Sequence, residues 1–356
     1  MENRLLLFRE RLLQREISAA IITDVKNIGY LCGYRFDDGC LLITQNVAYI
    51  ITDFRYKEEA QKYASSSFSV VTPDNKNVFI ADALKKETAA SVGYESRSLT
   101  VAEYHTYKNS ISLPFVPMGD VLQQMRAEKS DEEILAVKKA QSIAESAFEH
   151  TLSLMHPNMT ETDIALELSY QMRKKGGSGD SFNIIAVSGE SSALPHGKCR
   201  NSTISRGFLT IDFGCVYSGY CSDMTRTLSV GRATDEMRRV YNTVLTAQLA
   251  AIDFIKEGVF CKAVDSVARG IIEREGYGAA FGHSLGHGVG LDVHELPTLS
   301  PRSSETKLVA GHIVTVEPGI YLEGKFGCRI EDMGLVTKEG FENFTKTPKQ
   351  LIELFV

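Results

Sequence analysis

Two aspartates in the second half of the chain are spaced so that they can act on one ligand. Asp212 ends the apolar run 208–211, and Asp223 follows eleven positions later. Ser218-Gly219 lies between them and predicts a tight turn, so we expect a hairpin that sets the two carboxylates side by side. Carboxylates within about 4–6 Å of each other raise each other's pKa unless a cation neutralises them. The pair therefore predicts a bound cation.

Two glutamates repeat this arrangement further along the chain. Glu317 ends the apolar run 313–316, Glu331 follows fourteen positions later, and Pro318-Gly319 is predicted to turn the chain between them. Together with His287 these four carboxylates form an oxygen-rich set with one imidazole, which suits hard or borderline divalent ions. A pair of such ions about 3.5–4 Å apart would hold a hydroxide between them. Any one of these acids alone would more often be a turn residue, but five positions that fit one site favour a metal centre.

The segment 282–297 concentrates three of the eight histidines among glycines that disfavour both helix and strand. It allows two interpretations. Gly282-His283-Ser284-Leu285-Gly286 has the G-x-S-x-G form of a nucleophile elbow, which would make Ser284 the nucleophile of a serine hydrolase. Alternatively the histidines bind metal and substrate. The elbow is the less favoured interpretation, because a poor strand precedes Ser284 and the later glycines and Pro297 prevent the helix that must follow it.

Composition limits the class of protein. The chain has 356 residues, 43% of them hydrophobic and 24% charged, which indicates two domains of an ordinary globular protein. The net charge of −6 without a dense basic run argues against nucleic acid, and no apolar run is long enough for a membrane span. Seven scattered cysteines and the lack of a signal peptide point to the cytoplasm. We expect Cys215 and Cys221 to be packing thiols beside the metal ligands.

Residues 1–125 are predicted to form a small α/β domain. A helix over 2–15, a strand over 17–23, a hairpin over 41–52 and short strands at 68–71 and 90–94 follow from the apolar periodicity. This region has no cluster of histidines or carboxylates, and Asp53 and Arg55 are interpreted as a helix cap and a solvated charge.

Residues 126–356 are predicted to contain two related halves. Capping signals at Ser130 and Thr160 begin two helices that end near 155 and 176, and a second helix pair is expected over 235–256 and 262–275. Strands are expected after each pair, at 182–187, 207–213 and 225–230 and then at 311–316 and 333–337. This order places two helix pairs and two sets of strands around one shared site.

The motifs around these positions resemble the pita-bread metallopeptidases, the creatinase/prolidase/methionine aminopeptidase superfamily, and within it the Xaa-Pro branch of aminopeptidase P and prolidase. The resemblance is close over roughly 130–356. It rests on Pro195-His196-Gly197, Asp212-Phe213-Gly214, Ser222-Asp223-Met224-Thr225-Arg226, Gly286-His287-Gly288-Val289-Gly290, His294-Glu295-Leu296-Pro297, Glu317-Pro318-Gly319-Ile320-Tyr321 and Arg329-Ile330-Glu331-Asp332.

The resemblance implies roles for individual residues. Asp212 would bind one ion, His287 and Glu317 the other, and Asp223 and Glu331 would bridge both. Glu317 would also shuttle a proton. His196 and His294 would contact the substrate and stabilise the tetrahedral intermediate, His283 would lie near the substrate's proline, and Arg329 would orient the carboxylates from behind.

The resemblance further implies an α+β pita-bread catalytic domain over 126–356 and a creatinase-type N-terminal domain over 1–125. The expected activity is hydrolysis of the Xaa-Pro bond at the N-terminus of peptides or in dipeptides, by the bridging hydroxide of two divalent ions. Manganese is the first expectation for the metal, with cobalt, zinc or iron as alternatives. A proline-containing peptide is the expected partner, and a homodimer the expected assembly. A pita-bread scaffold without catalytic activity is the remaining alternative, which the intact ligand set disfavours. Whether dipeptides or longer peptides are preferred does not follow from the sequence.

Overall fold

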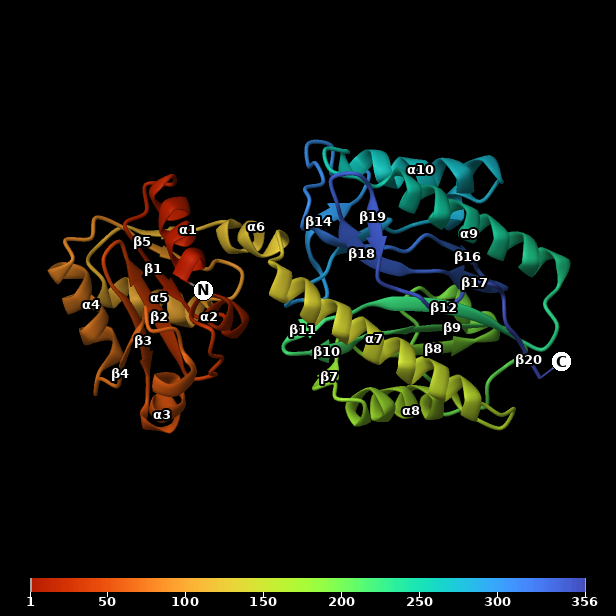
Figure 1. Cartoon of the computed structure of the whole chain (residues 1–356), viewed down its shortest axis with the longest axis horizontal. Coiled ribbons are helices and arrows are strands. Elements are labelled where there is room, and N and C mark those ends of the chain that lie inside the picture. Colours follow the sequence, from red (N-terminus) through yellow and green to blue (C-terminus); the bar gives the residue numbers. More distant parts are fainter. Residues whose placement is uncertain (1, 356) are drawn as a thin grey trace. The chain divides into compact units, whose positions relative to one another are not determined.

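The computed structural model describes residues 2–355, and the chain divides into two compact units, Met1–Met125 and Arg126–Val356. The first unit is built on a mixed sheet of six strands (Figure 1). The strand order is β4-β3-β2-β1-β5-β6, in which β1 pairs antiparallel with β2 and parallel with β5. Apolar side chains of α4 and α5, among them Ile80, Leu84 and Tyr107, pack on one face of this sheet. Its elements are α1 (Glu2–Leu13), β1 (Ala19–Ile22), α2 (Val25–Cys32), β2 (Gly39–Thr44), β3 (Ala48–Thr52), α3 (Phe54–Tyr63), β4 (Ser69–Val71), α4 (Lys76–Lys86), β5 (Val92–Tyr94), α5 (Val101–Ser110), β6 (Phe115–Pro117) and α6 (Val121–Ala127).

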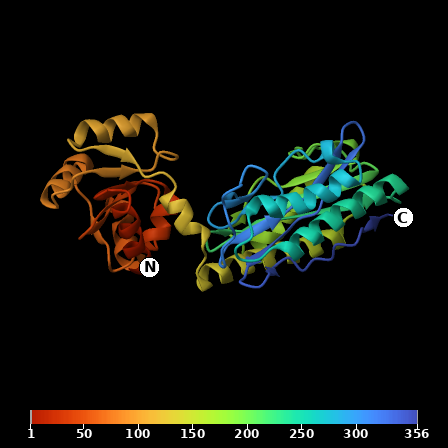
Figure 2. The same ribbon diagram turned by 90° about the horizontal axis from the view of Figure 1, so that it is seen from above.

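The second unit repeats one plan twice, a pair of helices and an antiparallel sheet. Helices α7 and α8 pack against the sheet β20-β12-β9-β8, and helices α9 and α10 pack against strands of the sheet β14-β13-β15-β18-β19. Figure 1 shows the strands between these two helix pairs, and Figure 2 shows helices α9 and α10 (teal and cyan) in front of the strands.

The elements of the first half are α7 (Asp131–Leu154), α8 (Glu161–Lys174), β7 (Gly179–Asp180), β8 (Ile185–Ser188), β9 (Gly207–Phe213), β10 (Cys215–Tyr217), β11 (Tyr220–Cys221) and β12 (Met224–Val230). Those of the second half are α9 (Asp235–Phe254), α10 (Cys261–Arg274), β13 (Gly286–Gly288), β14 (Glu295–Leu299), β15 (Ile313–Val316), β16 (Gly319–Leu322), β17 (Phe326–Arg329), β18 (Asp332–Val336), β19 (Phe341–Asn343) and β20 (Glu353–Leu354). The short 3₁₀ segments are η1 (Gly189–Ala193) and η2 (Gly278–Ala280).

Local sequence signals predict the helix starts well. Ser130 with Glu133 and Thr160 with Asp163 form complete capping boxes, so each side chain satisfies a free backbone N–H of the first turn. Asp53 caps α3 by accepting a hydrogen bond from Arg55 N, which confirms its interpretation as a cap. No helix within residues 2–355 is both long and apolar enough to cross a membrane.

The predicted turns have different outcomes. Ser218 and Gly219 have positive φ and close the β10–β11 hairpin between the two aspartates, as predicted. The turn prediction at Pro318-Gly319 is wrong. Gly319 begins β16, and the chain reverses around Gly324, whose φ of 69° permits the tight turn between β16 and β17.

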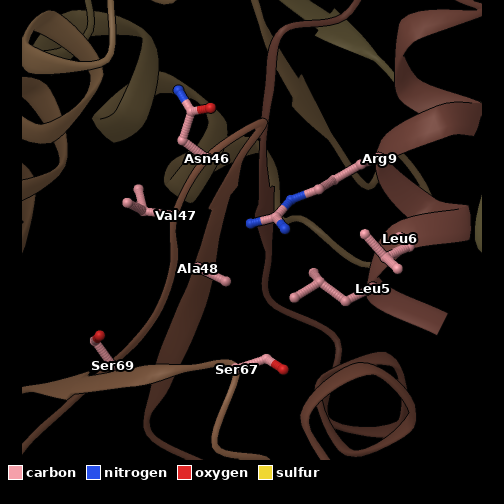
Figure 3. A pocket seen from close by; sticks show the side chains of 8 residues that line it. All are labelled: Leu5, Leu6, Arg9, Asn46, Val47, Ala48, Ser67 and Ser69. Atoms are coloured by element: carbon pink, nitrogen blue, oxygen red, sulfur yellow. The ribbon is translucent and has the colours of Figure 1, made fainter. Parts of the chain in front are cut away.

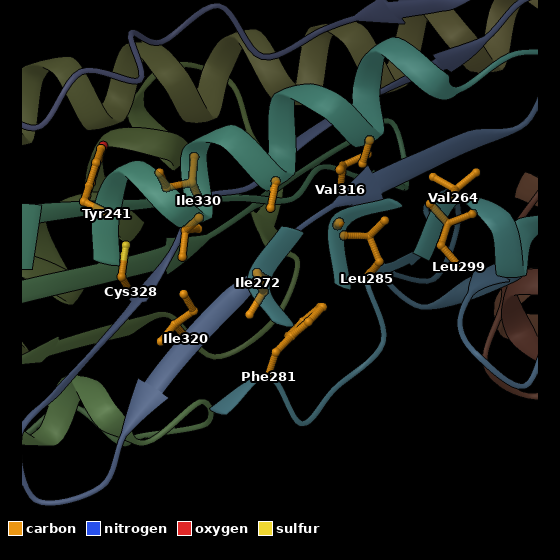
Figure 4. Packing of buried hydrophobic residues seen from close by; sticks show 14 of the residues in the cluster. Tyr241, Val264, Ile272, Phe281, Leu285, Leu299, Val316, Ile320, Cys328 and Ile330 are labelled. Atoms are coloured by element: carbon orange, nitrogen blue, oxygen red, sulfur yellow. The ribbon is translucent and has the colours of Figure 1, made fainter. Parts of the chain in front are cut away.

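The apolar core of the second half holds the site strands in place (Figure 4). Leu285, Val316 and Ile330 are fully buried in this cluster, and each precedes His287, Glu317 or Glu331 by one or two positions. Successive side chains of extended backbone point to opposite faces, so burying Val316 and Ile330 directs the next residue, an acid, away from this core. Core packing thus orients the ligands.

Candidate metal centre

The four acidic residues converge where the two sheets of the second unit approach each other. Asp212 lies in β9 opposite Thr225 of β12, and Asp223 immediately precedes β12. Glu317 immediately follows β15, and Glu331 immediately precedes β18. A backbone bridge joins Thr225 to Glu331, and so the two halves bring their acids to one place.

His287 completes the cluster from β13. Ligand atoms of Asp223, His287 and Glu331 all lie within 4.8 Å of one another. Nε2 of His287 lies 3.6 Å from Oδ2 of Asp223 and 3.3 Å from Oε1 of Glu317. The structure therefore brings His287 together with Asp223, Glu317 and Glu331, and the charge of Glu317 also acts on Asp212.

The electrostatics of this cluster call for a cation. Burial, and then the negative charges of neighbouring acids, raise the pKa of both Asp223 and Glu331 well above their ordinary values. Both residues are nearly inaccessible, with 4% and 1% of their surface exposed. Oδ1 of Asp212 is buried and has no hydrogen-bond partner among the described residues. An unsatisfied buried carboxylate oxygen beside two acids of raised pKa fits divalent ions, whose charge would stabilise the ionised forms.

Two acids of the cluster have cationic partners within the protein. Nη2 of Arg329 donates a 2.6 Å hydrogen bond to Oδ2 of Asp212, yet burial still raises the pKa of Asp212. Burial is the largest single influence on Glu317 and acts to raise its pKa, but the hydrogen bond with His287 and the nearby charges of His287, His283 and Arg329 together lower the pKa of Glu317.

The orientation of His287 is fixed by its second ring nitrogen. Nδ1 lies 3.1 Å from the carbonyl oxygen of Gly288, which can only accept, so Nδ1 carries the proton and Nε2 faces the acids. Oγ1 of Thr315 accepts a 3.1 Å bond from the backbone N–H of His287. Burial acts to lower the pKa of His287, but the hydrogen bond and charge of Glu317 outweigh it, so the pKa is raised and the metal-free ring favours the protonated state. On losing its Nε2 proton, the ring would present a lone pair to a metal ion.

A chain of hydrogen bonds links the acids to His283. Nη1 of Arg329 donates to the hydroxyl of Tyr321 at 2.8 Å, and that hydroxyl lies 3.0 Å from Nε2 of His283. Because Nδ1 of His283 faces the carbonyl of Ser284 at 2.8 Å, the neutral ring donates there and accepts the Tyr321 proton at Nε2. Burial lowers the pKa of His283, which favours this neutral state.

Two functional positions were not singled out from the sequence. Tyr321 connects Arg329 to His283, and Thr225 donates 2.8 Å to Oε2 of Glu331 while accepting from Nε of Arg329 at 3.1 Å. Both lie inside motifs already named: Thr225 is in β12, two residues after Asp223, and Tyr321 is in β16, four residues after Glu317. Their positions a few residues after proposed ligands were the sequence signal that could have identified them.

The remaining two histidines border the cluster. The ring of His294 meets that of His287 edge-on, with centroids 4.2 Å apart. His196 is exposed on the loop after η1, and its imidazole acts on the pKa values of both His283 and His294. His196 therefore lies within electrostatic range of both other predicted substrate histidines.

Ser284 does not stand on a nucleophile elbow. Irregular backbone precedes it, and the strand β13 rather than a helix follows it. The structure thus contradicts the serine-hydrolase interpretation, because no strand-to-helix turn exposes the hydroxyl.

The glycines of this segment are needed where its backbone passes close to neighbouring strands. A Cβ at Gly286 would lie 2.1 Å from Thr315 O, and one at Gly288 would lie 2.1 Å from Leu296 O. Close contact with neighbouring strands therefore excludes side chains. Cys215 lies in the core of the first half, where burial raises its pKa to about 12, and Cys221 packs in a separate buried cluster with Val289 and Met333.

A separate pocket of about 210 Å³ lies in the first unit (Figure 3). Arg9 projects into it from α1 between Ala48 and Leu5, and Nε of Arg9 donates to Thr44 O at 2.7 Å. The pocket contains none of the predicted site residues.

Known proteins share both units of this chain. Residues 136–338 match the model of metallopeptidase family M24, and residues 4–128 match that of the creatinase/prolidase N-terminal domain. An uncharacterized peptidase of Bacillus subtilis is 40% identical over 344 residues, 96% of this chain and 97% of that protein. An Xaa-Pro dipeptidase of Pyrococcus horikoshii is 36% identical over 345 residues, 95% of each chain.

Solved structures give the same result. The chain superposes on an Xaa-Pro dipeptidase from Bacillus anthracis with a TM-score of 0.96 at 40% identity, covering 99% of both chains. It superposes on an X-Pro aminopeptidase from Thermotoga maritima with a TM-score of 0.89 at 37% identity, covering 95% of this chain and 98% of that one.

The predicted fold class, a pita-bread domain of two related halves with a smaller α/β domain before it, is confirmed. The chain belongs to metallopeptidase family M24 and carries the creatinase/prolidase type of N-terminal domain.

Proposed function

We propose that this protein hydrolyses the Xaa-Pro bond at the N-terminus of short peptides with the help of two divalent metal ions. The observation that carries the proposal is the convergence of four acids and His287 from both halves of the second unit. The relatives named Xaa-Pro dipeptidase and X-Pro aminopeptidase support the choice of bond.

The assignment of ligands follows the proximity of the side chains. Asp223 and Glu331, central and nearly inaccessible, would each contact both ions. Asp212 would hold one ion, and His287 with Glu317 the other. When bound, such ions would supply Lewis acidity and lower the pKa of water at the site. Manganese remains the first candidate, since an oxygen-rich set with one imidazole accepts it readily.

The surrounding side chains would bind and orient the peptide. Arg329 holds Asp212 and Tyr321 in place, and Tyr321 fixes the tautomer of His283. His196 and His294 carry imidazole N–H groups that would donate hydrogen bonds to the scissile carbonyl as negative charge develops on its oxygen. Glu317, whose pKa is lowered, would accept a proton at its carboxylate and pass it to the leaving amine.

A substrate series with metal-free protein tests this proposal. Ala-Pro, Ala-Pro-Ala and Ala-Ala-Ala would be supplied with manganese, cobalt and zinc in turn. We expect cleavage of the first two peptides only, and only with added metal. The ratio of kcat/KM for the dipeptide and the tripeptide then decides between a dipeptidase and an aminopeptidase. Equal cleavage of Ala-Ala-Ala would refute the preference for proline, and full activity in the presence of chelator would refute the role of metal.

A further inference from the structure

The carboxylate of Glu295, the residue after His294, has basic side chains and a backbone N–H as its partners. Its side chain is only 4% exposed and lies between two basic side chains, Arg126 and Lys129. Oε1 accepts a hydrogen bond from Nη2 of Arg126, and Oε2 lies 3.4 Å from Nζ of Lys129. Loss of the charge on this buried carboxylate would be costly, because Arg126 and Lys129 would both lose the anionic partner that they share.

The same carboxylate ties down the backbone that leads to His294. Oε1 of Glu295 also accepts a 2.9 Å hydrogen bond from the backbone N–H of Asp292, whose side chain accepts from Arg126 at 2.5 Å. The carbonyl of Asp292 in turn accepts from Gly290 N at 3.0 Å. The segment 290–295 is therefore folded around one carboxylate.

The fit around this carboxylate is close. A Cβ at Gly290 would lie 2.5 Å from Oε2 of Glu295 and 3.0 Å from Cε of Lys129. Lys129 is itself held by the backbone bond from its N–H to Gly311 O at 3.0 Å. Neither the loop nor its basic partners can shift without disturbing the others.

His294 depends on this segment for its position. The part of the chain that the structure describes offers no hydrogen bond to its ring, which lies against the ring of His287. A ring without such a bond is placed by its own backbone and by packing, so displacement of the segment 290–295 would move the imidazole.

We propose that Glu295 is a positioning residue, which fixes the segment 290–295 through Arg126 and Lys129 and thereby holds His294 against His287 for contact with the substrate. The role of His294 rests on the proposed function, whereas the fixing of the segment does not. Glu295→Gln keeps the shape of the side chain and removes its charge, so it separates these two statements.

Hydrogen exchange measures the fixing of the segment directly, in the full-length protein with and without manganese. In Glu295→Gln we expect at least about tenfold faster exchange in the peptides that cover 289–296, because the acceptor of Asp292 N–H is weakened. The matched control is Glu145→Gln. Oε1 of Glu145 also holds a loop by accepting from backbone N–H groups, those of Lys346 and Thr347, and this loop is remote in sequence from His294. Unchanged exchange over 289–296 in Glu295→Gln would overturn the proposal.

A double-mutant cycle then tests the action through His294. We expect Glu295→Gln to lower kcat/KM for Ala-Pro-Ala about 10- to 100-fold in the otherwise native chain. In the His294→Ala background the same change should cost less than about twofold, because the group that Glu295 positions is gone. Equal losses in both backgrounds, the pattern expected of Glu145→Gln, would contradict positioning. If the native chain cleaves no Xaa-Pro peptide, the proposed function fails, and the exchange result still decides whether Glu295 fixes the segment.

Discussion

The two halves of the second unit share one plan but contribute different charges to the site. Each half supplies two acids at the ends of antiparallel strands, β9 and β12 in the first and β15 and β18 in the second. Only the second half adds cationic partners close to them, His287 and Arg329, and Arg329 reaches across to Asp212 of the first.

This difference explains why the site needs both halves. The first half alone would hold two buried acids without compensation, and the second would hold cations in excess of what Glu317 requires. The repeated plan places acids at strand ends in both halves, and the difference in basic residues between the halves sets the charge balance of the site. The central acids, Asp223 of the first half and Glu331 of the second, would then be neutralised by a bound metal ion.

The strongest test of this division removes one central acid at a time. We expect Asp223→Asn and Glu331→Gln each to lower kcat/KM on Ala-Pro-Ala by roughly 1,000-fold or more, because several kcal/mol of transition-state stabilisation depend on the ions they hold. Metal content after dialysis should fall in both variants. A large effect in one variant with native activity in the other would show that the halves do not contribute equally.

The exposed imidazoles give a second comparison, since His196 comes from the first half and His294 from the second. Each His→Ala change should lower kcat by about 100-fold, the loss typical of one donor to a developing oxyanion. Metal content should stay native in both, which distinguishes this loss from that of a ligand. A variant that loses metal instead would place its histidine among the ligands.

Arg329 tests the contact across the halves. Arg329→Lys keeps the charge but cannot donate to Asp212, Tyr321 and Thr225 together, as the guanidinium does. We expect about a tenfold loss of activity and weaker metal binding in an isothermal titration. Tyr321→Phe, which removes the bonds of the Tyr321 hydroxyl to Arg329 and His283 but leaves Arg329 on Asp212 and Thr225, is the milder control. Native metal affinity in Arg329→Lys would mean that Asp212 needs no support from the second half.

The smallest expected effect is on the stability of the metal-free protein. The pKa of Glu331 is raised on folding, so its contribution to stability is full below the ordinary value of 4.5 and is lost as pH rises through the folded-state pKa. Glu331→Gln resembles the protonated acid at every pH. It should raise the Tm of the metal-free protein by a few degrees at pH 8, roughly as 1 kcal/mol would, and change it little at pH 4. A lower Tm at pH 8 would show that the ionised acid is already compensated.

Much of the site could be predicted because its signals are local. A strand followed by an acid is visible at Asp212 and Glu317, and capping boxes mark the helices that support the sheets. The side-chain partners were harder. Tyr321 and Thr225 act through bonds that span 8 to 106 positions, and no local pattern indicates which hydroxyl faces which acid. The misplaced turn at Pro318-Gly319 has a similar origin, because strand pairing with Arg329 overrides the local turn preference.

The partners of Glu295 were also not predictable from the local sequence. Its position beside His294 is visible in the sequence, but its basic partners lie 166 and 169 positions away. The homodimer and the cytoplasmic location stay predictions, because neither follows from contacts within one chain.

A metal titration coupled to activity tests the central claim most directly. Manganese would be added stepwise to metal-free protein, with bound ions per chain and the rate of Ala-Pro-Ala cleavage measured at each step. We predict two ions per chain at saturation, a rate that rises with occupancy, and loss of at least one ion in His287→Ala. Saturated binding of fewer than two ions in the native chain, or a full rate before any ion binds, would contradict the account.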